Sequence, residues 1–141
     1  SIDSVIIPDN IRLRLNDKVS DPLVNLDYDQ MTQVFANLLK NAIDAMPGQG
    51  EIDFDLVDNH DQMIVSITDN GTGIPPENMD KLFTPFFTTK GPGKGTGLGL
   101  PIIYGIVKMH KGDINVKSNA DPAKGPTGTI FTITIPRNRL V

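Results

Sequence analysis

Apolar and polar residues alternate along several short stretches of the chain, as they do in strands that bury one face. Ile11-Arg12-Leu13-Arg14-Leu15 is the first example, and two later alternating stretches are joined by the turn-rich segment Asp58–Asp61. We expect strands at Ile11–Leu15, Glu51–Val57, Met63–Thr68, Asp113–Ser118 and Gly128–Ile135, with a further short strand at Leu23–Leu26.

Three other segments predict helices. The longest covers Asp29–Met46, with Asp27 as its N-cap and Pro47-Gly48 as its end. Shorter helices are expected at Glu77–Phe83 and Leu100–His110. No internal repeat or linker divides the chain, so residues 1–141 are predicted to form one domain. The order of elements predicts an α+β fold, a two-layer α/β sandwich with three helices over a mixed, mostly antiparallel sheet of about five strands.

The first predicted helix carries a narrow polar stripe. On a helical wheel the following residues fall within an arc about 100° wide: Gln30, Gln33, Asn37, Lys40, Asn41 and Asp44. The other positions are mostly apolar, so we expect this helix to be buried nearly all round apart from the stripe. Burying amides or carboxylates without partners costs about 1–3 kcal/mol each. Two interpretations remain open: a face bonded to solvent or loops, or a site for a hard cation such as Mg²⁺.

Composition and charge narrow the class of protein. The 141 residues include 13 Lys and Arg against 17 Asp and Glu, giving a net charge of −4, which argues against a nucleic-acid partner. Cysteine is absent, which excludes disulfides, thiolate metal sites and thiol catalysis. No apolar run approaches the roughly 18 residues of a membrane span, and no signal-peptide pattern opens the chain. We therefore expect a cytoplasmic domain that makes no membrane contact.

The loop that begins Asp69-Asn70-Gly71-Thr72-Gly73 follows an apolar strand. One interpretation is a simple tight turn, because Asn and Gly tolerate positive φ. The other is a base-binding loop, in which Asp69 accepts a hydrogen bond from a ligand amine and Gly73 allows a flat ring to approach the backbone.

A glycine-rich segment, Lys90–Leu100, contains alternate glycines and two lysines and leads into a predicted helix. Backbone N–H groups and the helix dipole make such a junction a ready anion site. The spacing fits neither a Walker A loop nor a Rossmann fingerprint. We interpret the segment as a mobile phosphate-binding lid, with a disordered flexible loop as the alternative.

Four segments in this order resemble the catalytic ATP-binding domain of sensor histidine kinases, in the superfamily that includes gyrase, Hsp90-type chaperones and mismatch-repair ATPases. The matching segments are Gln33-x-x-x-Asn37-Leu38-x-x-Asn41-Ala42 (N-box), Asp69-x-Gly71-x-Gly73 (first G-box), Leu82-Phe83-x-Pro85-Phe86-Phe87-Thr88-Thr89-Lys90 (F-box) and Gly95-Thr96-Gly97-Leu98-Gly99-Leu100 (second G-box). Each motif is weak alone, but the four together are specific. The F-box is most similar to that of the nitrogen-regulation type of kinase.

The resemblance implies a site for ATP and Mg²⁺. Asn41 would bind Mg²⁺ through its side-chain oxygen, Asp69 would accept from the adenine amino group, and Thr129 would lie near the base. Phe83 and Phe86 would anchor the lid. The nucleotide-binding residues that the resemblance implies are Asn37, Asn41, Asp44, Ala45, Asp69, Gly71, Gly73, Ile74, Phe83, Phe86, Lys90, Gly95, Thr96, Gly97, Leu98, Gly99, Leu100 and Thr129.

The resemblance also assigns catalytic roles to Asn37, Lys90 and Lys94. Asn37 stands where hydrolysing members of the superfamily carry a Glu general base. An amide cannot take a proton from water, so ATP would be kept for phosphoryl transfer. Many relatives carry an Arg after the F-box aromatics, whereas Thr88 occupies that place here. Lys90 or Lys94 would therefore supply the positive charge at the γ-phosphate.

The phosphoacceptor motif of the family, a His followed by Glu, is missing from the sequence, and we interpret His60 and His110 as structural. We expect the ATP-binding half of a sensor kinase, a piece of a longer chain and a monomer by itself. Its partners would be the dimerisation domain that carries the phosphoacceptor histidine and, through that domain, a response regulator. The alternatives are an ATP-driven switch or ATPase module of the gyrase and chaperone type, and a domain that binds nucleotide without transferring phosphate.

Overall fold

A computed structural model of the chain describes residues 7–18, 28–46, 48–59, 61–84 and 99–136, and it describes the side chains of the first long helix from residue 32 onward. The strands are β1 (Ile11–Lys18), β2 (Gly50–Asp58), β3 (Gln62–Asp69), β4 (Asp113–Asn119) and β5 (Gly128–Pro136). The helices are α1 (Tyr28–Asp44), α2 (Pro76–Met79) and α3 (Gly99–Met109), with a 3₁₀ turn at Pro122–Lys124.

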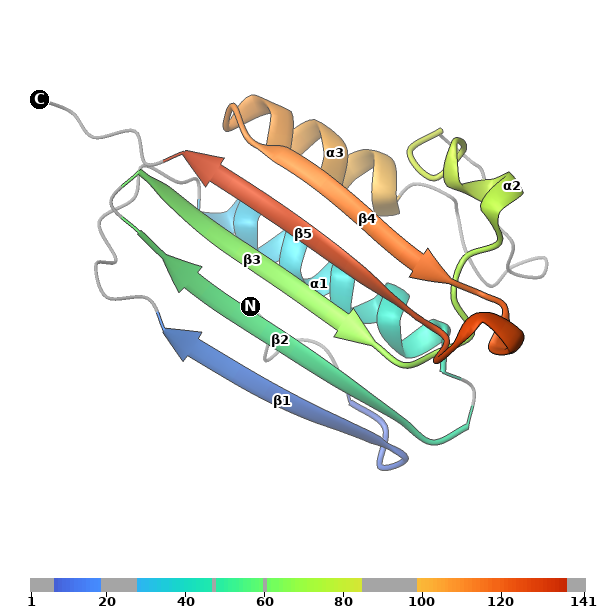
Figure 1. Cartoon of the computed structure of the whole chain (residues 1–141). Helices are drawn as coiled ribbons and strands as arrows, with labels where there is room; N and C mark the ends of the chain where they lie inside the picture. Colours follow the sequence, from blue (N-terminus) through green and yellow to red (C-terminus); the bar gives the residue numbers. More distant parts are fainter. Residues whose placement is uncertain (1–6, 19–27, 47, 60, 85–98, 137–141) are drawn as a thin grey trace, which may run out of the picture.

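The five strands form one mixed sheet in the order β1-β2-β3-β5-β4 (Figure 1). β1 runs parallel to β2, and the other three pairs are antiparallel. Helices α1 and α3 lie against each other on the same face of the sheet (Figure 1). The predicted α+β sandwich with a mostly antiparallel sheet is therefore confirmed.

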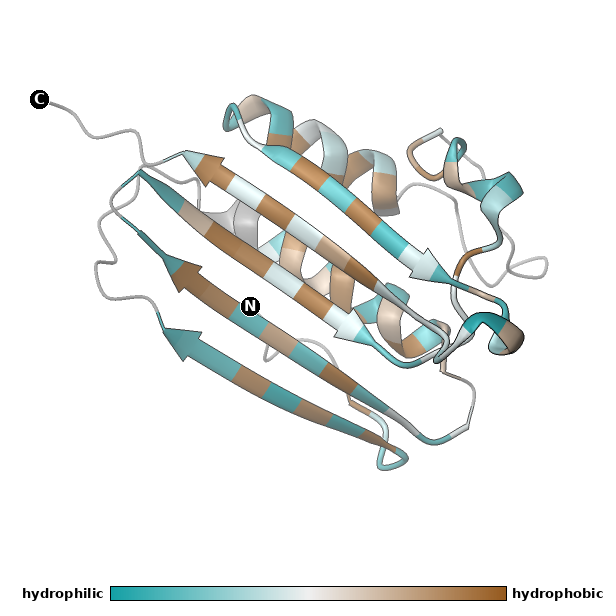
Figure 2. Ribbon diagram, in the orientation of Figure 1, coloured by the Kyte–Doolittle hydropathy of each residue, from teal (hydrophilic) through white to brown (hydrophobic). Residues whose placement is uncertain are grey.

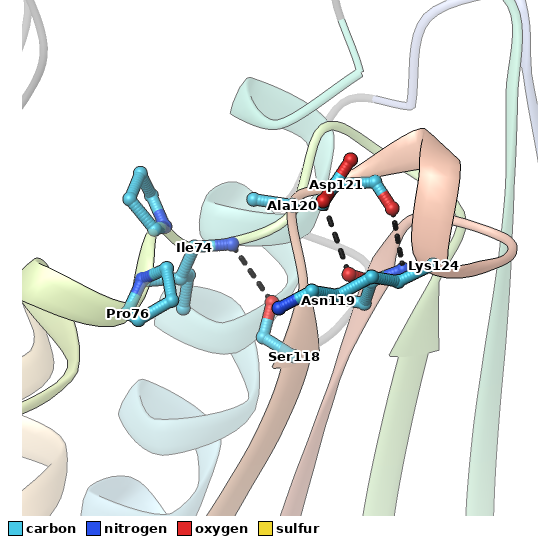
Figure 3. A pocket seen from close by; sticks show the side chains of 8 residues that line it. Ile74, Pro76, Ser118, Asn119, Ala120, Asp121 and Lys124 are labelled. Carbon is cyan, nitrogen blue, oxygen red and sulfur yellow. Dashed lines mark hydrogen bonds between the residues drawn. The ribbon is translucent and has the colours of Figure 1, made fainter.

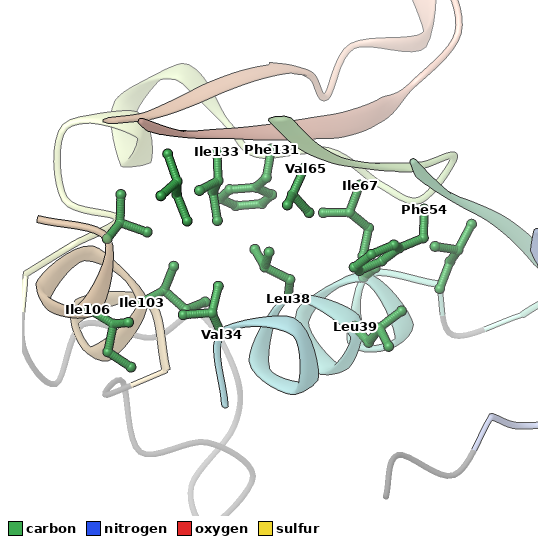
Figure 4. Packing of buried hydrophobic residues seen from close by; sticks show 14 of the residues in the cluster. Val34, Leu38, Leu39, Phe54, Val65, Ile67, Ile103, Ile106, Phe131 and Ile133 are labelled. Atoms are coloured by element: carbon green, nitrogen blue, oxygen red, sulfur yellow. The ribbon is translucent and has the colours of Figure 1, made fainter. Parts of the chain in front are cut away.

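The core lies between this sheet face and the two long helices (Figure 4). Alternate strand residues point toward it, which gives the strands their banded hydropathy in Figure 2. The fully buried side chains include Val34, Leu38 and Leu39 of α1, Phe54 of β2, Val65 and Ile67 of β3, Ile103 and Val107 of α3, and Ile133 of β5. The opposite sheet face is polar at its β1–β2 edge, where Arg12 pairs with Glu51 at 3.7 Å and Arg14 with Asp53 at 3.5 Å.

Several boundaries differ from the predicted ones. β1 continues past Leu15 to Lys18, because its polar end stays in register with β2 and the Asn16 side chain donates to Asp55 at 2.8 Å. The predicted helix at Glu77–Phe83 is a single turn, Pro76–Met79, followed by further turns. The predicted strand at Leu23–Leu26 and the cap Asp27 lie outside the described residues.

The burial expected for α1 was too extensive. Val34, Leu38, Leu39 and Ala42 are buried, but Phe35, Ala36 and Ile43 are only half-buried. The helix contacts the sheet on one side and α3 on another, and its remaining flank stays partly open within the described part of the chain.

Candidate functional site

The core face of the sheet changes from apolar to polar at one end. One row across the sheet consists of Phe54, Ile67, Phe131 and Val116 on neighbouring strands. The next row consists of Ile52, Asp69, Thr129 and Ser118. Asp69 and Thr129 are the only buried polar or charged side chains among the described residues, at 7% and 4% exposure. Three polar groups therefore lie side by side where an apolar row would extend the core.

Asp69 is held by the backbone that follows it. The Gly71 N–H donates to its Oδ1 at 2.9 Å, and the N–H of Thr129 on β5 also donates to the carboxylate. Burial raises the pKa of Asp69 above its ordinary value of 3.8, and these two backbone donors lower the pKa by less than burial raises it. The carboxylate is thus a destabilised anion, to which a further hydrogen-bond donor would be favourable.

The raised pKa predicts a stability change with pH. The folded chain keeps the Asp69 proton to a higher pH than the unfolded chain, so stability is lost as the pH rises from below 3.8 through the folded pKa. The Asp69→Asn variant has no titrating carboxyl group at this position, so it does not lose this stability as the pH rises. We expect the melting temperature of Asp69→Asn minus that of the wild type to rise across this window and to stay constant above it. Thermal melts of both chains between about pH 3 and 7 measure this difference. A difference that does not change with pH would contradict the raised pKa of Asp69.

The loop after Asp69 is packed between the end of α1 and the end of β4. Thr72 N–H donates to the Ala45 carbonyl at 3.0 Å, and a Cβ at position 71 would collide with the same carbonyl oxygen. Gly73 has φ +78°, and a Cβ there would collide with the carbonyl of Asn119. Both glycines are therefore required by contacts within the protein. From the sequence, the only reason for Gly73 was the approach of a ligand ring. The close contact with Asn119 is a second reason, which the sequence does not reveal.

The polar stripe of α1 leads toward this loop. Asn37 and Asn41 are half-buried, while Gln33, Lys40 and Asp44 are exposed; the side chain of Gln30 lies outside the described residues. Nδ2 of Asn41 is buried and has no hydrogen-bond partner within the described part of the chain. A buried amide left in this state is costly, so this position favours an additional partner over a solvated face.

The described part of the F-box packs on α3. Leu82 is buried, and the Phe83 ring lies 5.1 Å from that of Tyr104, tilted by 41°. Of the second G-box, Gly99 and Leu100 form the first turn of α3, and Leu100 packs against the core. The other predicted residues of this region lie outside the described residues: Phe86, Lys90, Lys94, Gly95, Thr96, Gly97 and Leu98.

His110 has a local role at the end of α3. Its backbone N–H donates to the Ile106 and Val107 carbonyls, and its ring Nδ1 lies 2.8 Å from the Ile106 carbonyl, to which it must donate. These contacts support the structural interpretation of this residue. His60 lies outside the described residues.

Ser118 is the site residue that the sequence analysis missed. Its hydroxyl bonds to Ile74, Gly128 and Thr129 and links β4 and β5 to the Asp69 loop. The signal was present in the alternation Ile114, Val116, Ser118, which places a hydroxyl on the core face.

Figure 3 shows the bond between Ile74 and Ser118 at the edge of a pocket of about 390 Å³. The pocket is lined by Ile74, Pro75, Pro76, Ser118, Asn119, Ala120, Asp121 and Lys124. Of the residues predicted for the nucleotide site, Ile74 alone lines it, so this pocket adjoins the predicted site without coinciding with it.

The fold is a two-layer α/β sandwich whose core is polar at one end. The family described as "Histidine kinase-, DNA gyrase B-, and HSP90-like ATPase" matches residues 26–139. The chain is 36% identical to sporulation kinase C of Bacillus subtilis (strain 168) over 136 residues, which are 96% of this chain and 30% of that protein. It is 40% identical to sensor histidine kinase ZraS of Salmonella typhimurium over 127 residues, which are 89% of this chain and 26% of that protein.

Comparison with solved structures also finds sensor histidine kinases. The catalytic domain of histidine kinase ThkA superposes with a TM-score of 0.76 at 35% identity, covering 91% of this chain and 81% of that one. The mycobacterial sensor histidine kinase MprB gives 0.74 at 29% identity, covering 93% of this chain and 86% of that one. The chain therefore belongs to the family of histidine kinase-, gyrase B- and HSP90-like ATPases, and it is an ATP-binding domain of the histidine-kinase type.

The chain spans less than a third of the length of the two curated relatives named here. None of the helices in the described ranges is long and apolar enough to cross a membrane. The nitrogen-regulation type of kinase stays a prediction.

Proposed function

We propose that the chain binds ATP with Mg²⁺ at the polar end of its core and donates the γ-phosphoryl group to a histidine on a separate dimerisation domain. The observation that carries this proposal is Asp69, a buried carboxylate that continues the apolar face of β3 and faces the polar groups of β5. Such a group suits the amino group of adenine, because burial strengthens a hydrogen bond to a charged acceptor.

Asn41 supports a role for Mg²⁺. The buried Nδ2 atom of this α1 residue has no partner among the described residues, and rotating the amide by half a turn places Oδ1 where Nδ2 now lies. Mg²⁺ is commonly held by one or two protein oxygens together with substrate phosphates. The described ranges contain no group of three or more His, Cys, Asp and Glu side chains that could hold a metal ion. We therefore assign the ion to Asn41 and the nucleotide, where it would neutralise phosphate charge.

Asn37 favours transfer to histidine over hydrolysis. It lies one turn before Asn41 on α1 and is half-buried, and its amide cannot accept a proton from an attacking water. An imidazole needs no such base. Its nitrogen lone pair forms the bond to the γ-phosphorus while the bond to the β,γ-bridging oxygen breaks, and ADP leaves with that electron pair. Lys90 or Lys94 would stabilise the charge that develops on the phosphoryl oxygens.

The partners follow from this chemistry. The acceptor is a dimerisation domain with a phosphorylatable histidine, and the phosphoryl group would pass from there to a response regulator. By itself we expect the chain to be a monomer that acts in the cytoplasm. An ATP-driven switch of the gyrase and chaperone type has no specific support in the described site, because position 37 carries an amide.

Transfer in trans tests the proposal. The chain, radiolabelled ATP, Mg²⁺ and the dimerisation domain of the same kinase are mixed, and the label should appear on that domain in an acid-labile form typical of phosphohistidine. Rapid release of inorganic phosphate without labelling would favour the ATPase. ATP binding without either reaction would favour a non-catalytic nucleotide-binding domain.

Replacing Asn41 by Ala tests the Mg²⁺ assignment. We expect affinity for a non-hydrolysable ATP analogue to fall by about tenfold in Mg²⁺, roughly the worth of one hydrogen bond or ligand, and to change little in EDTA. Titration calorimetry in both buffers measures this difference. Asn115→Ala is a matched control, because Asn115 is exposed on β4. Equal affinity with and without Mg²⁺, in wild type and variant alike, would remove the assignment.

A further inference from the structure

Ser118 joins three parts of the candidate site through one hydroxyl. Its Oγ lies 2.8 Å from the Ile74 backbone nitrogen, 2.9 Å from the Gly128 carbonyl and 2.8 Å from Thr129 Oγ1. The first of these bonds, drawn in Figure 3, holds the loop that follows Asp69. The other two reach the beginning of β5, where Thr129 lies opposite Asp69 in the sheet.

A hydroxyl has one proton and two lone pairs, which fixes the direction of these bonds. The Ile74 N–H can only donate, so Ser118 accepts from it. The Gly128 carbonyl can only accept, so the Ser118 proton is directed to it. Thr129 must then donate its own hydroxyl proton to Ser118. With this arrangement all three hydrogen bonds form, and the Ser118 hydroxyl has used its one proton and both lone pairs.

This arrangement determines what the Thr129 hydroxyl can offer to a ligand. Once its proton is directed to Ser118, its hydroxyl offers only lone pairs to any ligand. The neighbouring Asp69 carboxylate also offers only lone pairs. The side chains of Asp69 and Thr129 then present acceptors and no donor.

We propose that Ser118 determines base specificity: by taking the Thr129 proton, it makes the site an all-acceptor surface that favours a 6-aminopurine and disfavours a 6-oxopurine. This inference rests on the proposed nucleotide function. A 6-amino group donates to such a surface, directly or through a water molecule. A 6-oxo group at the same place meets oxygen lone pairs instead, and the one donor on that edge of the base, N1–H, lies at the next ring position. Such a mismatch of acceptor against acceptor is an effective way to reject a ligand.

The test compares ATP with inosine triphosphate, which carries a 6-oxo group in place of the 6-amino group. Titration calorimetry with Mg²⁺ measures both affinities for the wild type, Ser118→Ala and Ser118→Thr. The wild type should prefer ATP by at least about tenfold, the effect of one misplaced hydrogen bond. In Ser118→Ala the Thr129 hydroxyl is released and can donate to the 6-oxo group, so the preference should fall severalfold. Ser118→Thr keeps the hydroxyl and should restore the preference.

A purely structural role for Ser118 predicts a different result. If Ser118→Ala weakens ATP and inosine triphosphate by the same factor, the residue only holds the loop and the inference is overturned. Equal binding of the two nucleotides by the wild type overturns it as well. If the wild type binds neither nucleotide, the proposed function fails first, and the inference fails with it.

Two further variants serve as a substitute for Ser118→Ala and as a control. If Ser118→Ala does not fold, Ser118→Cys can replace it, because a thiol is a weak hydrogen-bond partner of similar shape. Lys117→Ala serves as the control, because Lys117 is the preceding residue of β4 and is exposed. Its ratio of affinities should equal that of the wild type.

Discussion

Replacing Asp69 by Asn should weaken binding of a non-hydrolysable ATP analogue by roughly tenfold to a hundredfold, with the fold retained. A hydrogen bond to a charged group contributes about 1.5–3 kcal/mol, and the variant removes the charge. The new amide can still accept from the Gly71 N–H, which now bonds to Oδ1 at 2.9 Å. Its NH₂ group, however, replaces one acceptor with a donor. Titration calorimetry in Mg²⁺ measures the loss.

The control for this change is Asp53→Asn, in which a carboxylate paired with Arg14 on the exposed sheet face loses its charge. This variant should bind the analogue as the wild type does. Asp69→Asn should also melt at or above the wild-type temperature at neutral pH, because it removes a buried charge. Unchanged affinity in Asp69→Asn would show that this carboxylate does not contact the ligand.

Replacing Phe54 by Ala should lower the free energy of unfolding by about 3–5 kcal/mol, the usual cost of removing a buried aromatic ring. Phe54 is 0% exposed on β2 and meets the Phe35 ring of α1 edge-on, with centroids 5.5 Å apart. The variant therefore leaves a cavity between sheet and helix. Since domains of this kind are stable by only about 5–15 kcal/mol, the loss is a large share of the total.

Chemical denaturation of the wild type and the variant measures this loss. Val57→Ala is the matched control, because Val57 lies on the same strand but is 41% exposed; it should cost less than about 1 kcal/mol. Similar losses in the two variants would contradict the assignment of Phe54 to the core.

The sequence predicted the sheet well because its strands have one buried face. In β3 the residues Met63, Val65, Ile67 and Asp69 are buried in turn, and this alternation is visible in the sequence. Element ends were less predictable, because they depend on partners far away in the chain. The last residues of β1 are polar and lie beyond the predicted end at Leu15, yet they pair with β2 in parallel register.

The candidate site was predicted in part. Asp69 and the glycines after it were found from the local pattern, but the collision partners of Gly71 and Gly73, Ala45 and Asn119, could be found only from the packing of the loop. Ser118 was missed because a single serine in a strand has no signature of its own. Its role depends on lying opposite Thr129 in the β4–β5 register, which sequence spacing alone does not define.

Amide chemical shifts of the isotope-labelled chain, recorded while an ATP analogue and Mg²⁺ are added, test the central claim most directly. Ligand binding at the polar end of the core should shift the amides of Asn41, Asp69, Gly71, Gly73 and Thr129. The amides of Arg14 and Asp53, at the exposed β1–β2 edge, should stay in place. Shifts confined to this edge, or no shifts at saturating nucleotide, would contradict the account.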